Sequence, residues 1–113
     1  MREASDAIDT AVYAELQDTA GAEFAAELVG TFFEEAPLML ADLRSALAEH
    51  NRERFRRAAH SLKSNSHTFG ATKLAALARE LELGGLPADG MPLDTLDAEY
   101  ARAAAALQAL ARG

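Results

Sequence analysis

The chain's most informative pattern is the run FRRAAHSLKSNSHTFG, which extends from Phe55 to Gly70. Placed on a helix, this run has one side that is apolar or small at every third or fourth position. Those positions are Phe55, Ala59, Leu62, Ser66 and Phe69. The spacing predicts a helix that packs this side against neighbouring helices.

His60 lies beside this apolar side rather than on it, because each residue of a helix turns the chain by about 100°. One turn away lie Arg56 and Arg57 before it, and Lys63 and Ser64 after it. A neutral imidazole offers a nitrogen lone pair near pH 7, and the cations would attract an anion such as a phosphoryl group. The pattern fits nucleophilic chemistry on an anion. It also fits an ordinary surface histidine on a basic helix.

These residues resemble the signature of histidine-containing phosphotransfer domains, which is H-x-L-K-G with a second glycine ten residues after the histidine. In this chain His60, Leu62, Lys63 and Gly70 match the signature, and Ser64 stands where its first glycine is expected. The resemblance extends through helix lengths and loop placement from about residue 8 to the C-terminus. It implies a phosphorelay intermediate that is phosphorylated on a ring nitrogen of His60.

The resemblance also implies the reaction and its participants. His60 would accept a phosphoryl group from an aspartyl phosphate of a response-regulator receiver domain and pass it to an aspartate of another receiver. A hybrid sensor kinase is a further expected partner, and Mg²⁺ is expected on the receiver, so we expect no cofactor on this chain. The expected site comprises three phosphoryl-stabilising cations and three residues that shape the approach: Lys63, Arg56 and Arg57, then Ser64, His67 and Gly70. Exposed apolar residues of a helix over 22–36 would add docking contacts.

The composition restricts the remaining function classes. At 113 residues the chain is long enough for one domain, and it has no cysteine for disulfides or thiolate metal sites. Its net charge of −7 argues against a nucleic-acid-binding protein. No apolar run reaches membrane-spanning length, and no glycine-rich loop of the P-loop type is present. Together with the phosphoryl-carrier role that the resemblance implies, these features lead us to expect a cytoplasmic, monomeric protein that binds neither membrane nor ATP and has no autokinase activity.

The whole pattern predicts an all-α fold without strands. Pro37 suits the first turn of a helix, Asn51 suits an N-cap and Gly70 suits a helix end. We predict an up-down-up-down four-helix bundle in a single domain over 1–113, with short N-terminal helices over about 9–36 covering one end. The four helices of the bundle are expected at about 37–49, 52–68, 71–83 and 92–112.

Three other interpretations are open at this level. A metal site would need ligands three or four residues apart on one helix, whereas His60 and His67 are two turns apart and His50 lies across a turn. A dimerisation and phosphoacceptor domain of a sensor histidine kinase has an acidic residue after its histidine and a proline a few positions later. Here Ser61 and Asn65 occupy those positions. The third interpretation is a non-catalytic helical adaptor in which the histidine is incidental.

Overall fold

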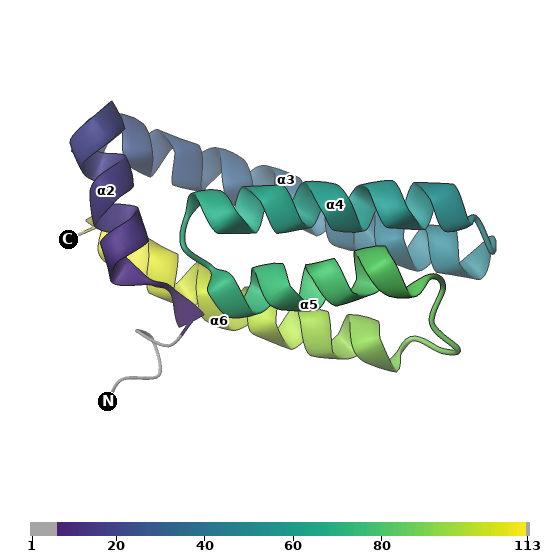
Figure 1. The fold of residues 1–113 in the computed structure, drawn as a ribbon. Helices are drawn as coiled ribbons and strands as arrows, with labels where there is room; N and C mark the ends of the chain where they lie inside the picture. Colours follow the sequence, from purple (N-terminus) through teal and green to yellow (C-terminus); the bar gives the residue numbers. More distant parts are fainter. Residues whose placement is uncertain (1–6, 113) are drawn as a thin grey trace.

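The computed structural model describes residues 7–112, and every regular element in that range is an α-helix (Figure 1). The helices are α2 (Thr10–Ala20), α3 (Ala22–Ala48), α4 (Arg52–Thr68), α5 (Thr72–Gly84) and α6 (Met91–Arg112). The expected all-α fold is therefore confirmed over the described range. None of these helices combines the length and the apolarity needed to cross a membrane.

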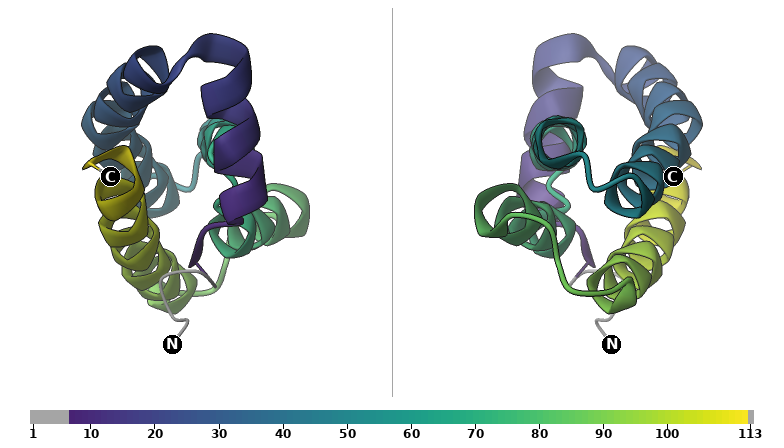
Figure 2. Two further views of the ribbon diagram at one scale, coloured as in Figure 1. Left: turned by 90° about the vertical axis from the view of Figure 1, so that its left-hand side faces the viewer. Right: turned by 90° about the vertical axis from the view of Figure 1, so that its right-hand side faces the viewer.

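Four of the helices lie lengthwise beside one another, and α2 crosses one end. α4 packs against α3 and α5, and α6 packs against the same two helices. α2 contacts α3 and α4, and Figures 1 and 2 show it lying across the end where α4 finishes. Large buried side chains from the four lengthwise helices fill the space between them, among them Phe32, Phe55, Leu62, Leu74 and Leu107.

α3 is one helix of 27 residues, so the expected break before Pro37 is wrong. Its buried positions keep a single helical register across that proline, from Val29 and Phe32 to Leu43. A proline inside a helix removes one hydrogen bond and costs about 3 kcal/mol or more. Pro37 is exposed and displaces no core side chain, so burial along the whole of α3 outweighs this local preference. The predicted helices over 22–36 and 37–49 are one element, and α2 precedes it.

α4 begins and ends where the sequence predicts. Asn51 caps its first turn by accepting a hydrogen bond from the backbone N–H of Arg54 at 3.1 Å. Beyond its last residue, Gly70 has a φ of 78°, a left-handed conformation that glycine adopts without steric cost. The predicted apolar side is at most 3% exposed along its whole length, at Phe55, Ala59, Leu62, Ser66 and Phe69.

The turn at Gly70 also joins α4 to the start of α2. The backbone N–H of Asp9 donates a hydrogen bond to the Gly70 carbonyl at 2.7 Å. A Cβ at position 70 would lie 2.7 Å from the Asp9 carbonyl oxygen, closer than Cβ atoms normally approach a neighbour. Aromatic rings gather at this end, since the Phe32 ring centroid lies 5.1 Å from that of Phe69 and 5.8 Å from that of Tyr100. The end of the molecule under α2 is therefore closed by close backbone and aromatic packing.

α5 and α6 depart from their predicted ranges by about one residue at their ends. Asp89 accepts a hydrogen bond from the backbone N–H of Met91 at 3.0 Å, so α6 begins one residue before Pro92. The apolar side of α6 is buried at Leu93, Leu96, Ala103 and Leu107, with Tyr100 and Leu110 partly buried.

Candidate functional site

His60 lies in the middle of α4, on the side that faces away from the core. Its side chain is 55% exposed, while the preceding residue, Ala59, is fully buried. The predicted location beside the buried side of the helix is therefore confirmed. Because α4 is packed along its whole length, the backbone of His60 is held firmly while its imidazole remains accessible.

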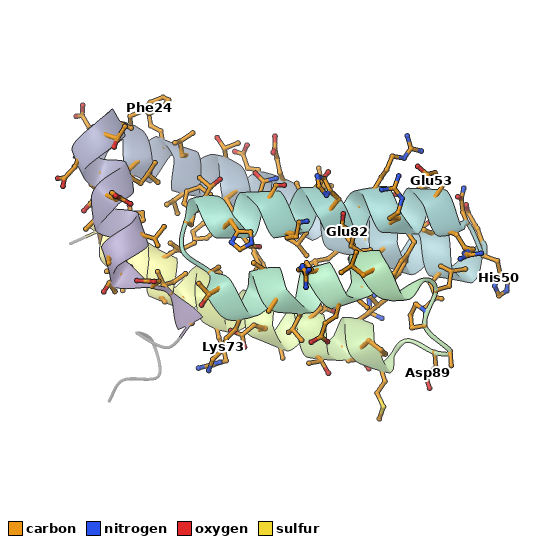
Figure 3. The ribbon with its side chains drawn as sticks, in the orientation of Figure 1. Phe24, His50, Glu53, Lys73, Glu82 and Asp89 are labelled. Atoms are coloured by element: carbon orange, nitrogen blue, oxygen red, sulfur yellow. The ribbon has the colours of Figure 1, made fainter. Side chains whose placement is uncertain are left out.

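Glu82 of α5 contacts the imidazole directly. Its Oε2 lies 2.7 Å from Nδ1 of His60, and Figure 3 shows the Glu82 side chain rising from α5 toward α4. The Glu82 side chain is only 11% exposed, so the carboxylate is held between the two helices. Nε2 has no hydrogen-bond partner among the residues that the structure describes. Nε2 is therefore the ring nitrogen that is left to react.

Lys63, one turn after His60, contacts the other oxygen of the same carboxylate. Its Nζ lies 2.8 Å from Oε1 of Glu82. The hydrogen bonds from Lys63 and then from His60 lower the pKa of Glu82 below its ordinary value, against the smaller opposing effect of burial. The carboxylate is therefore ionised at neutral pH, and an ionised carboxylate can only accept hydrogen bonds.

The two arginines before His60 are paired within their own helix. Arg56 Nη2 lies 2.6 Å from a Glu53 carboxylate oxygen, and Arg57 Nε lies 3.9 Å from the same oxygen. The hydrogen bond from Arg56 lowers the pKa of Glu53. Both arginine side chains are more than half exposed. The predicted cations are present on the turns around His60, but carboxylates accompany them, and the site is less basic than the sequence stretch indicates.

The three residues expected to shape the site lie in different places. Ser64 is exposed one turn after His60 and leaves that surface free of a large side chain. His67 is also exposed, but two helical turns from His60 correspond to about 10 Å along the axis. Gly70 is buried against Asp9 at the end of the helix, roughly 15 Å from His60. Only Ser64 adjoins His60, and the structure gives Gly70 a packing contact with the start of α2.

The sequence pattern did not identify Glu82, because site residues were sought on the helix that carries His60. α4 and α5 are consecutive helices joined by a tight turn, and they pack against each other. His60 and Glu82 lie equally far along the chain on either side of Ala71, which is in that turn. In a helical hairpin, two residues that are equally far from the turn in sequence are also at about the same distance from it along the helix axes. This symmetry could have indicated from the sequence that Glu82 lies opposite His60.

An open groove runs beside the site between α3 and α4. Its lining includes Leu38, Met39, Asp42, Arg57, Ala58 and Ser61. Leu38 is 69% exposed. Docking contacts were expected from residues 22–36, where Phe24 is 51% exposed, but Figure 3 places Phe24 near α2, away from Glu82. The exposed apolar surface beside the site therefore comes from the second half of α3.

Metal ligation has no support in the described range. Across residues 7–112, no group of three or more His, Cys, Asp or Glu side chains is placed to hold a metal ion. His60 uses one ring nitrogen for Glu82, and His67 lies two turns away.

The chain was compared with models of known protein families. The family model of the Hpt domain matches residues 27–106. This segment contains all of α4 and α5 and most of α3 and α6, and it includes His60, Lys63 and Glu82. Neither the curated proteins nor the solved structures contain a significant match.

Proposed function

This chain belongs to the Hpt domain family, and from that membership we propose that His60 carries a phosphoryl group between receiver domains of a phosphorelay. Hpt domains take part in phosphotransfer and interact with response-regulator receiver domains. The observation that carries the proposal is the state of the imidazole. It is exposed at the middle of α4, with Nδ1 engaged by Glu82 and Nε2 available.

The transfer consists of two displacements at phosphorus. The lone pair of Nε2 attacks the aspartyl phosphate of one receiver, and the bond from phosphorus to the aspartate oxygen breaks with its electron pair remaining on the carboxylate. The product is a phosphoryl imidazolium that retains the proton on Nδ1. A carboxylate oxygen of the second receiver then attacks phosphorus, and the electron pair of the N–P bond returns to Nε2. Mg²⁺ and catalytic side chains of the receiver would offset the charge that develops on the phosphoryl oxygens.

The cations around His60 have different availabilities for this task. Arg56 and Arg57 are more than half exposed, and their pairing with Glu53 is a surface ion pair of the kind that contributes little to stability. Phosphoryl oxygens can therefore compete for both guanidinium groups. Lys63 is 21% exposed and is already bound to Glu82. We expect the arginines to contact the phosphoryl group and Lys63 to act mainly through Glu82.

The fold that would support this role is an up-down-up-down four-helix bundle. In its favour, each of α4, α5 and α6 packs against the helix before it, and α6 also packs against α3. Each of these helices contributes large apolar side chains to one buried core, which suits a monomer and a single domain.

The receiver would cover the exposed side of α4 and the adjoining groove. Leu38, which lines this groove together with Ser61, offers an apolar contact there, and Arg57 of the same lining offers charge to an acidic phosphorylation site. A hybrid sensor kinase would present the first receiver, and a separate response regulator the second.

Labelling from a phosphorylated receiver tests the proposal. His60→Gln should abolish acid-labile phosphoryl label while leaving the helical circular dichroism unchanged, because exposed substitutions usually change stability by about 0.5 kcal/mol or less. His67→Gln is the matched control, since it removes an exposed imidazole of the same helix and should label normally. Label that persists in His60→Gln and disappears in His67→Gln would overturn the assignment.

A further inference from the structure

The side of α3 that borders α4 continues beyond the groove toward α2. α3 and α4 are joined by a short turn and pack against each other, so they run antiparallel (Figure 1). Leu38, Asp42 and Ser45 of α3 line the groove between them. Glu35 precedes Asp42 by seven residues, so the helix period places both on the same side of α3, about 10 Å apart along its axis. Glu35 therefore lies on the groove side of α3, one turn beyond Leu38.

The two carboxylates on this side of α3 have different surroundings. Arg54 of α4 donates a hydrogen bond from Nε to Asp42 at 2.9 Å. Near the level of Glu35, α4 presents Ser61 and Ser64, which are exposed and carry no charge. The Glu35 side chain is exposed and has no hydrogen-bond or ion-pair partner among the described residues. The charge of Asp42 is offset within the protein, whereas the charge of Glu35 is available to a partner.

The sequence separates charge along this face of the molecule. No lysine or arginine occurs between Arg2 and Arg44, so the exposed carboxylates in the first half of α3 have no cation on their own helix. The first two turns of α4, at the other end of the face, carry four arginines: Arg52, Arg54, Arg56 and Arg57. The face is therefore negative toward α2 and carries cations toward the Asn51 turn.

Leu38 lies between these two regions. Its side chain is 69% exposed and shares the groove with Arg57, whose side chain is 68% exposed. An exposed leucine with a carboxylate on one side and a guanidinium on the other matches a partner surface of a particular kind. That surface has an apolar contact with a cation on one side and acidic groups on the other. Charge complementarity of this kind fixes register and disfavours wrong partners more than it adds affinity.

We propose, on the basis that receivers are the partners of His60, that Glu35 is a specificity-determining residue that binds a lysine or arginine side chain of the receiver. The acidic phosphorylation site of the receiver then lies toward Arg57, and its cation lies on the α2 side of Leu38. A receiver docked in the opposite direction would place its acidic groups against the carboxylates of α3. Receivers that lack a cation at this place exchange the phosphoryl group with His60 more slowly.

Glu35 would act on docking and not on the imidazole. The hydrogen bond to the His60 ring comes from Glu82 of α5, whereas Glu35 is on α3. Phosphoramidate, a small phosphoryl donor, labels a reactive histidine without a receiver. Glu35→Lys should therefore be labelled by phosphoramidate at the parent rate. Lysine and glutamate are similarly good helix formers, so the helical circular dichroism should also be unchanged.

The test measures kcat/KM for transfer to His60 from a panel of phosphorylated receiver domains of the same organism. With the receiver that labels the parent fastest, Glu35→Lys should lower kcat/KM about tenfold at about 50 mM salt, because it replaces an attraction by a repulsion. The difference should shrink to about twofold or less at about 500 mM salt, where exposed charges are screened. Glu80→Lys is the matched control, since it makes the same charge change at an exposed position of α5 and should remain within about twofold of the parent.

The cation of the receiver is located by changing its exposed lysines and arginines to glutamate one at a time. One such reversal should slow transfer to the parent and restore transfer to Glu35→Lys, and failure of every reversal to do so would overturn the inference. Equal kcat/KM in Glu35→Lys and Glu80→Lys at low salt would also overturn it, as would slow phosphoramidate labelling of Glu35→Lys. A parent that phosphoramidate labels on His60 but that no receiver labels would instead contradict the proposed function, and the inference with it.

Discussion

The two ends of α4 are held by different kinds of interaction. At the Gly70 end, backbone atoms of Asp9 and Gly70 are in direct contact beneath α2, and aromatic rings pack beside them. At the Asn51 end, the capping side chain is exposed and the charged side chain of Arg54 bridges to Asp42 and Glu49. The Gly70 end is held in place by steric fit. The Asn51 end is held by polar contacts that water can replace.

This difference indicates which end determines the geometry of the site. His60, Lys63 and Glu82 come from α4 and α5, and the Gly70 turn connects these two helices. A change in the backbone at that turn shifts α5 along α4 and so alters the alignment of Glu82 with His60. A change at the Asn51 end alters how α4 meets α3, which supplies no residue to the His60–Glu82 contact.

The largest effect is expected from Gly70→Ala. An alanine in the left-handed conformation costs about 1–2 kcal/mol, and its Cβ would lie 2.7 Å from the Asp9 carbonyl oxygen. Relieving that overlap should cost a further 1–3 kcal/mol or so, giving a total loss of roughly 2–5 kcal/mol. Urea unfolding followed by circular dichroism measures the change in the free energy of unfolding.

Substitutions at two other glycines separate the conformational cost of alanine from the cost of its overlap with Asp9. Gly21 has a φ of 96°, but a Cβ added there would meet nothing within 4 Å, so Gly21→Ala should show the conformational cost alone. Gly30 lies inside α3 with similar open space, and Gly30→Ala should stabilise the protein by about 0.5–1 kcal/mol. Equal losses in Gly70→Ala and Gly21→Ala would show that the contact with Asp9 contributes nothing to stability.

A smaller effect is expected from Asn51→Ala at the opposite end. The substitution removes the acceptor for the Arg54 backbone N–H and should cost about 1 kcal/mol, as for other N-caps. Asn65→Ala is the control within the same helix, because the Asn65 side chain donates its hydrogen bond to the backbone carbonyl of Ser61 in its own helix and alanine is the better helix former. A loss in Asn51→Ala as large as that in Gly70→Ala would contradict the contrast between the two ends.

The smallest effect is expected from Arg44→Ala, also at the Asn51 end. Arg44 of α3 lies 2.9 Å from Asp94 and 2.6 Å from Asp97 of α6, but its side chain is 44% exposed. Exposed ion pairs contribute about 0.2–1 kcal/mol, and salt screens them. Urea unfolding in low and high salt should show that Arg44→Ala lowers the free energy of unfolding less as the salt concentration increases. The control Lys73→Ala, at an exposed lysine of α5, should change the free energy of unfolding little at either salt concentration. If salt does not affect the decrease in the free energy of unfolding caused by Arg44→Ala, Arg44 stabilises the protein through packing rather than through its charge.

Local sequence signals predicted α4 well and its surroundings less well. The cap at Asn51, the buried side from Phe55 to Phe69 and the exposed position of His60 all follow from helix periodicity and termination, which depend on neighbouring residues. Pro37 was misinterpreted because the rule for proline is local, whereas the burial that keeps α3 continuous is tertiary. Glu82 and the contact between Asp9 and Gly70 involve separate helices, so no single-helix pattern contains them.

The position of the Gly70 turn also has a consequence for folding kinetics. The contact between His60 and Glu82 spans 22 residues and lies within one helical hairpin, whereas the contact between Asp9 and Gly70 joins residues much farther apart in the chain. Contacts between residues close in sequence tend to form early, and distant ones form late. We therefore expect α4 and α5 to pair before α2 docks. The part of the Gly70→Ala loss that comes from overlap with Asp9 would then accelerate unfolding more than it slows folding.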